Sequence, residues 1–141
     1  MHYFSIRPEV AGGLGPNTVM DRSAHPPLVS HLNYEFDGWS GDVLLAGFPA
    51  FIVTEDAMNK LMESGVTGAR FADVEITKSG EFTDFYPGRQ LPKFAWLQVT
   101  GRVGQDDFGL AGKIRLVISE RALDVLKGLQ LTDALIEPFE N

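Results

Sequence analysis

Two stretches of the chain carry the same order of apolar and polar residues. Residues 51–61 read FIVTEDAMNKL, and residues 116–126, which follow at an offset of 65, read LVISERALDVL. Each opens with three apolar residues rich in branched side chains, which is typical of a strand covered on both faces. Apolar positions then recur at helical spacing. The pattern predicts two strand–helix–strand units, over residues 51–74 and 116–139, that form an internal repeat.

Short polar residues mark the boundaries of both predicted helices. Thr54 and Ser119 directly follow the apolar runs, and their side-chain oxygens are suited to accept hydrogen bonds from the free N–H groups of a first helical turn. Acidic residues come next in both copies, where the positive end of the helix dipole favours negative charge. Gly65 is expected to end the first helix, and the second is expected to run from about Glu120 to Gly128.

Alternation of apolar and polar residues predicts the remaining strands. Residues 32–36 alternate as in a strand with one buried face, and residues 94–100 form a strand around Trp96. The pattern does not decide whether residues 42–46 form a helical turn. Further strands are expected over residues 2–6, 112–118 and 135–139, and loops over residues 8–17, 21–27 and 82–88.

These elements indicate a single α+β domain over residues 1–141. Both strand–helix–strand units are expected to pack on one mixed sheet, which the N-terminal strands and a central hairpin complete. A chain of this length buries roughly two thirds of its unfolded surface, so it needs no disulfide or metal to hold its fold.

Composition excludes several classes of site. The chain has no cysteine, which excludes disulfides, thiol catalysis and cysteine-ligated zinc. No apolar run approaches the ~18 residues of a membrane-spanning helix, and the N-terminus lacks the order of a signal peptide, so we expect a cytoplasmic protein without membrane association. The formal net charge of −7 argues against nucleic-acid binding and suits a basic protein partner, although solubility alone also explains it.

The sequence contains no complete motif for catalysis or for metal or cofactor binding. His2, His25 and His31 are not spaced as metal ligands, so no metal site is expected. The glycine-rich loop over residues 12–16 lacks the lysine, hydroxyl and capped helix of a phosphate cradle. Residues 107–109 spell Asp-Phe-Gly, the metal-binding tripeptide of kinases, but no other kinase motif accompanies it. We expect no cofactor and predict that the protein is not an enzyme.

Paired carboxylates offer a weaker signal. Asp37 and Asp42 are close enough in sequence to act as an acid and a base, but an acidic chain contains many such neighbours, and the chemistry also needs a pocket. Asp106 and Asp107 are expected to solvate a turn. We therefore assign no catalytic residue.

Aromatic residues in predicted loops distinguish the chain more clearly. Trp39, Phe85 and Tyr86 lie close in sequence to acidic residues, notably Asp37 and Asp84. Aromatic side chains are enriched at the centres of protein interfaces, and rim charges orient a partner. We interpret the three aromatic residues as candidate anchors and the two carboxylates as rim charges of a partner-binding surface. In the alternative interpretation, the aromatic side chains fold back and cover the sheet.

Three segments carry a resemblance to a known family, and they are Phe48–Glu55, Arg115–Ala122 and the C-terminal motif Leu131–Pro138. Through them about half of the chain, within residues 48–74 and 90–139, resembles bacterial immunity proteins of polymorphic-toxin systems, specifically the immunity protein family 11 class and its relatives. A related group shares the C-terminal motif but carries paired Cys-x-x-Cys motifs, which this chain lacks.

The resemblance implies a small cytoplasmic protein that binds and neutralises a cognate toxin, with no catalytic residues to transfer. We therefore expect an immunity protein that acts by stoichiometric occlusion of a toxin with a basic contact surface. The alternatives are a non-catalytic interaction or scaffold module and an enzyme of unrecognised type. A toxin gene directly beside this one would favour the first expectation.

Overall fold

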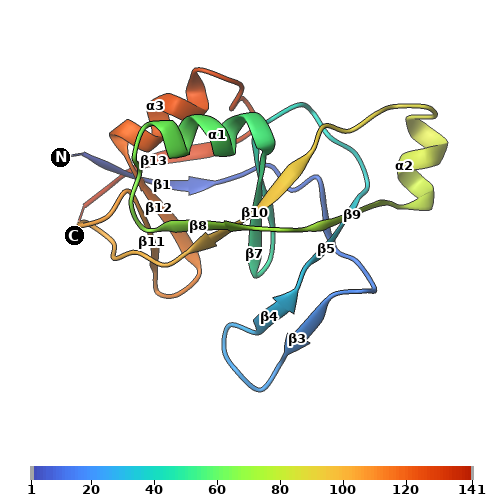
Figure 1. The fold of residues 1–141 in the computed structure, drawn as a ribbon, viewed down its shortest axis with the longest axis horizontal. Helices are drawn as coiled ribbons and strands as arrows, with labels where there is room; N and C mark the ends of the chain where they lie inside the picture. The colour runs from blue at the N-terminus through green and yellow to red at the C-terminus, as the bar shows by residue number, and fades with distance from the viewer. Residues whose placement is uncertain (1, 141) are drawn as a thin grey trace.

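The computed structural model describes residues 2–140 and places the two similar stretches in two different four-stranded antiparallel sheets (Figure 1). In the first sheet the strand order is β11-β12-β1-β13, and in the second it is β6-β7-β10-β8. The first sheet consists of β1 (Tyr3–Arg7), β11 (Phe108–Ala111), β12 (Arg115–Ser119) and β13 (Leu135–Phe139), and the second of β6 (Leu44–Gly47), β7 (Ala50–Thr54), β8 (Ala69–Ala72) and β10 (Phe94–Val99).

Both sheets have the same connectivity, and each contains one strand inserted from elsewhere in the chain. In each sheet a two-stranded hairpin is followed by a helix and then by a third strand of the same sheet. The third strand does not pair with the hairpin, so a position is left between them. In the second sheet β10 fills this position, and in the first sheet β1 fills it. Each sheet is therefore completed by a strand that is distant in sequence.

Helices α1 (Glu55–Glu63) and α3 (Glu120–Lys127) follow directly after β7 and β12. The Thr54 hydroxyl accepts a hydrogen bond from the Ala57 amide, and the Ser119 hydroxyl accepts one from Ala122, so both predicted N-caps are confirmed. The two helices pack against each other on one side of the molecule (Figure 1). The main core lies beneath them and contains Ile6, Val53, Leu61, Leu97, Phe108, Leu116, Ile118, Leu123 and Leu126, among others.

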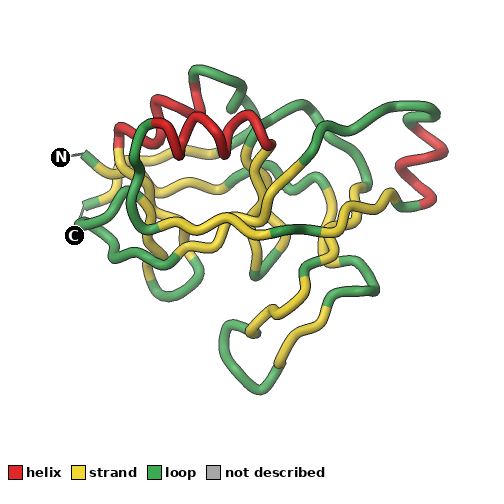
Figure 2. The backbone as a smooth tube through the Cα atoms, viewed as in Figure 1, coloured by secondary structure: helices red, strands yellow, loops and turns green. Residues whose placement is uncertain are grey.

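A smaller unit packs on the second sheet and shares a second core cluster with it, because this cluster includes Leu45, Ala50 and Ile52 of β6 and β7. Its sheet has the order β2-β5-β9 and joins β2 (Gly12–Leu14), β5 (Asn33–Phe36) and β9 (Glu75–Lys78). The short helix α2 (Gly80–Phe85) packs on this unit through its buried Phe82. A hairpin of β3 (Val19–Asp21) and β4 (Leu28–His31) projects away from the body (Figure 2).

Tyr34 fixes the smaller unit to the second sheet. Its hydroxyl donates to the Ala46 carbonyl of β6 and accepts from the Ala11 amide. The side chain is fully buried, and this burial raises the pKa of Tyr34 to about 12, so the phenol stays neutral and donates its proton. The neighbouring Gly12 is required, because a Cβ atom there would collide with the Glu35 carbonyl on β5.

The α+β class, the single-domain fold and both long helices were predicted correctly. The single mixed sheet was wrong: most pairings are antiparallel within separate sheets, and among the described strands only β5 and β9 pair in parallel, beside an isolated parallel bridge between Glu9 and Leu45. The local pattern of apolar residues does not reveal that β1 inserts between β12 and β13, or that β10 inserts between β7 and β8. These insertions place the two units in separate sheets. Two local predictions were also wrong, because residues 80–85 of the aromatic segment form α2 and residues 12–14 of the glycine-rich loop form β2. Residues 42–46, for which the pattern decided nothing, lie largely in strand β6.

Leu61 and Leu126 allow a direct test of the helix faces. Both side chains are fully buried, so replacing either with Ala should lower the free energy of unfolding by ~2–5 kcal/mol, through lost burial and the cavity left behind. Urea denaturation measures the loss. Met62→Ala is the matched control, since Met62 is 60% exposed on α1. Losses below about 1 kcal/mol at both leucines would contradict the assignment.

Candidate functional site

The residues expected to bind a partner meet in part at one end of the molecule. Trp39 follows β5, and Tyr86 is the residue after α2. The Arg89 guanidinium lies over both rings, 5.3 Å from the Trp39 centroid and 5.6 Å from that of Tyr86. The Tyr86 ring also packs 5.4 Å from the ring of the buried Phe82. The result is a cluster of two aromatic rings bridged by one cation.

A hollow of about 380 Å³ lies beside this cluster and is largely polar. Trp39, Tyr86 and Asp37 line it together with Glu9. One carboxylate oxygen of Glu9 accepts from the Ser40 amide at 2.8 Å, while the other is buried and has no hydrogen-bond partner in the described structure. A buried carboxylate oxygen without a partner favours a hydrogen bond from a donor that enters the hollow, such as a group of a bound partner.

Trp39 serves the fold as well as the surface. It is only partly exposed, its indole Nε1 donates to the Asp42 carbonyl at 2.9 Å, and its ring meets Phe94 edge-on at 5.8 Å. Trp39 therefore fits both interpretations, because part of its side chain covers the sheet and part remains exposed.

Phe85 and Asp84 occupy the exposed side of α2 and do not line the hollow. Phe85 is 71% exposed and Tyr86 is 41% exposed, so both offer apolar surface to a partner. The structure thus brings Trp39, Tyr86 and Asp37 together and leaves Phe85 and Asp84 on an adjoining surface. We call the residues of the hollow, together with Asp84, Phe85 and Arg89, the aromatic face.

Sequence reasoning missed Glu9 and Arg89 on this face. Glu9 lies in the loop after β1, where no pattern connects it with Trp39, and only tertiary structure places it there. Arg89 had a weak signal, since it follows the aromatic segment by three residues and arginine commonly stacks on aromatic rings.

Asp42 has a structural role and is not half of a catalytic pair. It is fully buried, and its two oxygens accept from the backbone amides of Thr132 and Asp133 and from the Thr132 hydroxyl, at 2.8–3.0 Å. Asp37 is exposed on the surface. Asp42 thereby connects the start of β6 with the segment that follows α3.

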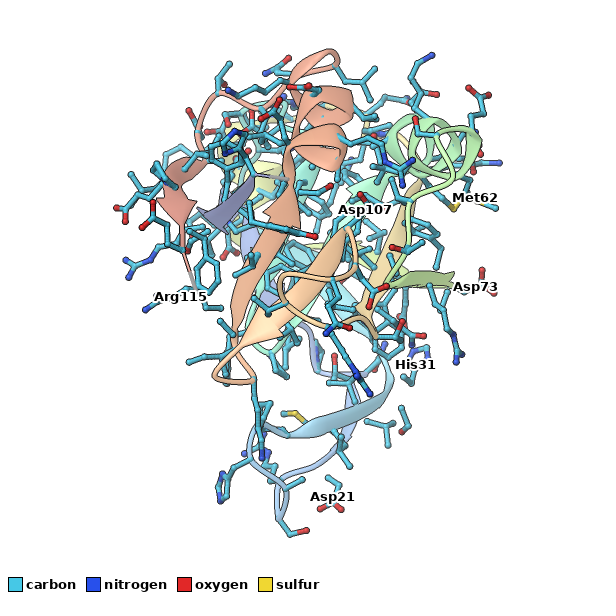
Figure 3. The ribbon with its side chains drawn as sticks, turned by 90° about the vertical axis from the view of Figure 1, so that its left-hand side faces the viewer. Asp21, His31, Met62, Asp73, Asp107 and Arg115 are labelled. Carbon is cyan, nitrogen blue, oxygen red and sulfur yellow. The ribbon has the colours of Figure 1, made fainter. Side chains whose placement is uncertain are left out.

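Asp107 was expected to solvate a turn, and this is wrong. Its side chain is only 4% exposed and accepts from the Thr67 amide and hydroxyl, the Ser119 hydroxyl and the Arg121 guanidinium. Figure 3 shows Asp107 in the interior, between strand and helix ribbons. Burial raises the pKa of this carboxyl, but the hydrogen bonds from Arg121, Ser119 and Thr67 outweigh it and lower the pKa to about 2.

Residues 2–140, which the structure describes, contain no group of three or more His, Asp or Glu side chains placed to hold a metal ion. No helix in this part of the chain is long and apolar enough to cross a membrane.

The chain matches no protein-family model, and no curated protein matches it. The resemblance to immunity proteins therefore stays a prediction.

The Asp107 network predicts a particular dependence of stability on pH. Because its folded pKa of about 2 lies below the ordinary 3.8, the carboxylate stabilises the fold above about pH 4, and this contribution is lost as the pH falls towards 2. Asp107→Asn should cost about 1–3 kcal/mol at pH 7 and weaken the fall in stability between pH 4 and 2. Urea midpoints across this range measure both effects.

Asp73→Asn is the control for this experiment, since Asp73 is exposed (Figure 3). The control should leave the midpoint at pH 7 and its dependence on pH close to those of the unmodified protein. An Asp107→Asn variant with the same acid dependence as the unmodified protein would show that the network does not set it.

Proposed function

We propose that the protein is a cytoplasmic immunity protein that binds a cognate toxin and neutralises it by stoichiometric occlusion, without turnover. The aromatic face carries this proposal, because it combines exposed aromatic surface with unpaired carboxylates. It supplies apolar surface for a contact and negative charge for its orientation. The resemblance to immunity proteins supplies the identity of the partner as a toxin.

Phe85 and Tyr86 are the proposed anchors. A protein interface gains most from aromatic side chains that lose their water in a pocket of the partner, and Phe85 is the more exposed of the two. Trp39 provides the rigid base of the face, since its ring is already held by Phe94 and Asp42. A base fixed before binding lowers the ordering cost of the complex.

The charges around these anchors favour a basic partner. Asp37, Glu9 and Asp84 contribute negative charge, and Glu81 in the first turn of α2 adds to it. Arg89 is the cation within the cluster, and its contacts with the two rings hold it there. Lysine and arginine side chains of a partner would find acceptors in Asp37 and in the unpaired oxygen of Glu9.

We also propose that the two halves of the chain form an internal pseudo-repeat. The hydrogen bonds of Asp42 and Asp107 support it. Asp42 in the first half accepts from Thr132 after α3, and Asp107 in the second half accepts from Thr67 after α1. Strand register supports it too, because equivalent partners differ by 65 residues. The equivalent pairs are Leu97 with Phe51 and Phe71, and Ile6 with Leu116 and Ile136.

Anchor substitutions test the aromatic face with the product of the neighbouring gene as the partner. Phe85→Ala or Tyr86→Ala should weaken binding by at least ~2 kcal/mol, about thirtyfold, because each removes desolvated contact area. Asp84→Asn should mainly slow association, and more so at low salt, because exposed charges steer the encounter. Calorimetry gives the affinities, and stopped-flow mixing gives the association rates.

Leu28→Ala is the matched control, because Leu28 is 65% exposed but lies on the projecting hairpin. It should bind the partner with unchanged affinity. If both anchor variants bind like the unmodified protein, the aromatic face is not the contact surface. If the neighbouring gene product does not bind at all, the immunity function itself is wrong.

A further inference from the structure

A mostly apolar hollow adjoins the aromatic face at Val10, which lines both hollows. It is a groove of about 630 Å³ between the turns of two hairpins, β6–β7 and β11–β12, and the segment after β1 closes one side of it. The side chains that define it are Val10, Phe48, Phe51 and Ile114, with Arg7 and Arg115 as its charged members. We call this the hairpin groove.

Three apolar side chains at the groove are unusually open to solvent. Val10 is 71% exposed, Phe48 65% and Ile114 57%, and each comes from a different turn or loop. Isolated exposed apolar residues are common, but a contiguous group around a hollow marks an interaction site. The three residues therefore define one continuous surface that burial in a complex would stabilise.

Two arginines give the groove a charge opposite to that of the whole chain. Arg7 and Arg115 lie one position beyond the β1–β12 pair Ile6–Leu116, so they face each other across neighbouring strands. Like charges in this position repel each other. Neither arginine has a carboxylate within salt-bridge distance in the described part of the chain, and no described acidic residue lines the groove.

Two acidic side chains lie near these arginines. Glu137 and Glu140 line an adjoining hollow together with Arg7 and Arg115, on the side of β13, but in the described structure neither carboxylate is within salt-bridge distance of an arginine. Arg115 extends at the outer edge of the molecule (Figure 3), where its guanidinium is accessible to a partner. An incoming carboxylate at the groove would relieve the repulsion between the arginines and gain charge-assisted hydrogen bonds.

We propose that the hairpin groove binds a protein segment in which large apolar side chains alternate with or flank carboxylates. The charge of the two arginines selects the acidic groups, and the exposed side chains of Phe48 and Ile114 receive the apolar ones. Because much apolar surface lies on the rim, a polypeptide covers it better than a small enclosed ligand does. This site is independent of the proposed toxin contact, which requires a basic partner.

A selection from a random peptide library on the immobilised full-length protein tests the proposal. Enriched peptides should combine Leu, Phe or Trp with Asp or Glu, and should bind with a one-to-one stoichiometry. Their affinity, measured by fluorescence anisotropy, should fall about tenfold or more in Phe48→Ser and in Ile114→Ser, since each removes an apolar contact. Arg115→Glu should remove the preference for acidic peptides.

Leu28→Ser is again the matched control, because it removes an equally exposed apolar side chain from the projecting hairpin. It should bind the selected peptides like the unmodified protein. Thermal unfolding of each variant, all at exposed positions, establishes that the fold is retained.

Several results would overturn the proposal. These are the absence of groove-dependent peptides, enrichment of basic peptides, or equal binding by the Phe48→Ser variant. Dodecanoate that binds the groove while acidic peptides do not would assign it to a small amphiphile. A protein dimer that dissociates in the Phe48→Ser variant would assign it to a second copy. Each result is independent of whether the protein binds a toxin.

Discussion

The carboxylates of Asp42 and Asp107 are buried, and a buried carboxylate is stable only where hydrogen bonds replace its lost hydration. Each finds these bonds in the other half of the chain: Asp42 with Thr132 and Asp107 with Thr67. These hydrogen bonds connect the start of each hairpin with the segment that follows the helix of the other half. Arg121 strengthens the connection made by Asp107, because its guanidinium also donates to the carbonyls of Ser64 and Gly65, directly after α1. The relative position of sheets and helices depends on these crossed links.

Both candidate surfaces follow from this arrangement. When the sheets are fixed side by side, the turns at residues 48–49 and 112–114 converge and form the hairpin groove. On the other side of the second sheet, Tyr34 holds the smaller unit in place, and this unit supports α2 with Tyr86. Val10 lies where the two surfaces meet, since it lines both hollows. The two proposed contact surfaces, one acidic and one with two arginines, therefore lie next to each other.

The sequence predicted what local chemistry determines. Apolar runs followed by Thr54 and Ser119 identified both helices, because capping and periodicity act within one turn. It did not predict the inserted strands β1 and β10, whose pairing depends on contacts far apart in the chain. Aromatic residues beside acidic ones in loops predicted Trp39, Tyr86 and Asp37 as partner-binding residues, and these three line one hollow, whereas Glu9 joins them only through tertiary structure. Asp107 was misjudged, because its burial arises from the packing of both halves.

The proposed immunity protein would neutralise its partner by covering it and not by turnover. This is tested by titrating the purified protein against the product of the neighbouring gene and following residual toxin activity. Occlusion predicts that activity falls linearly and ends near one equivalent, with the same endpoint after longer incubation. Protection by a small fraction of an equivalent, increasing with time, would contradict it and indicate catalysis.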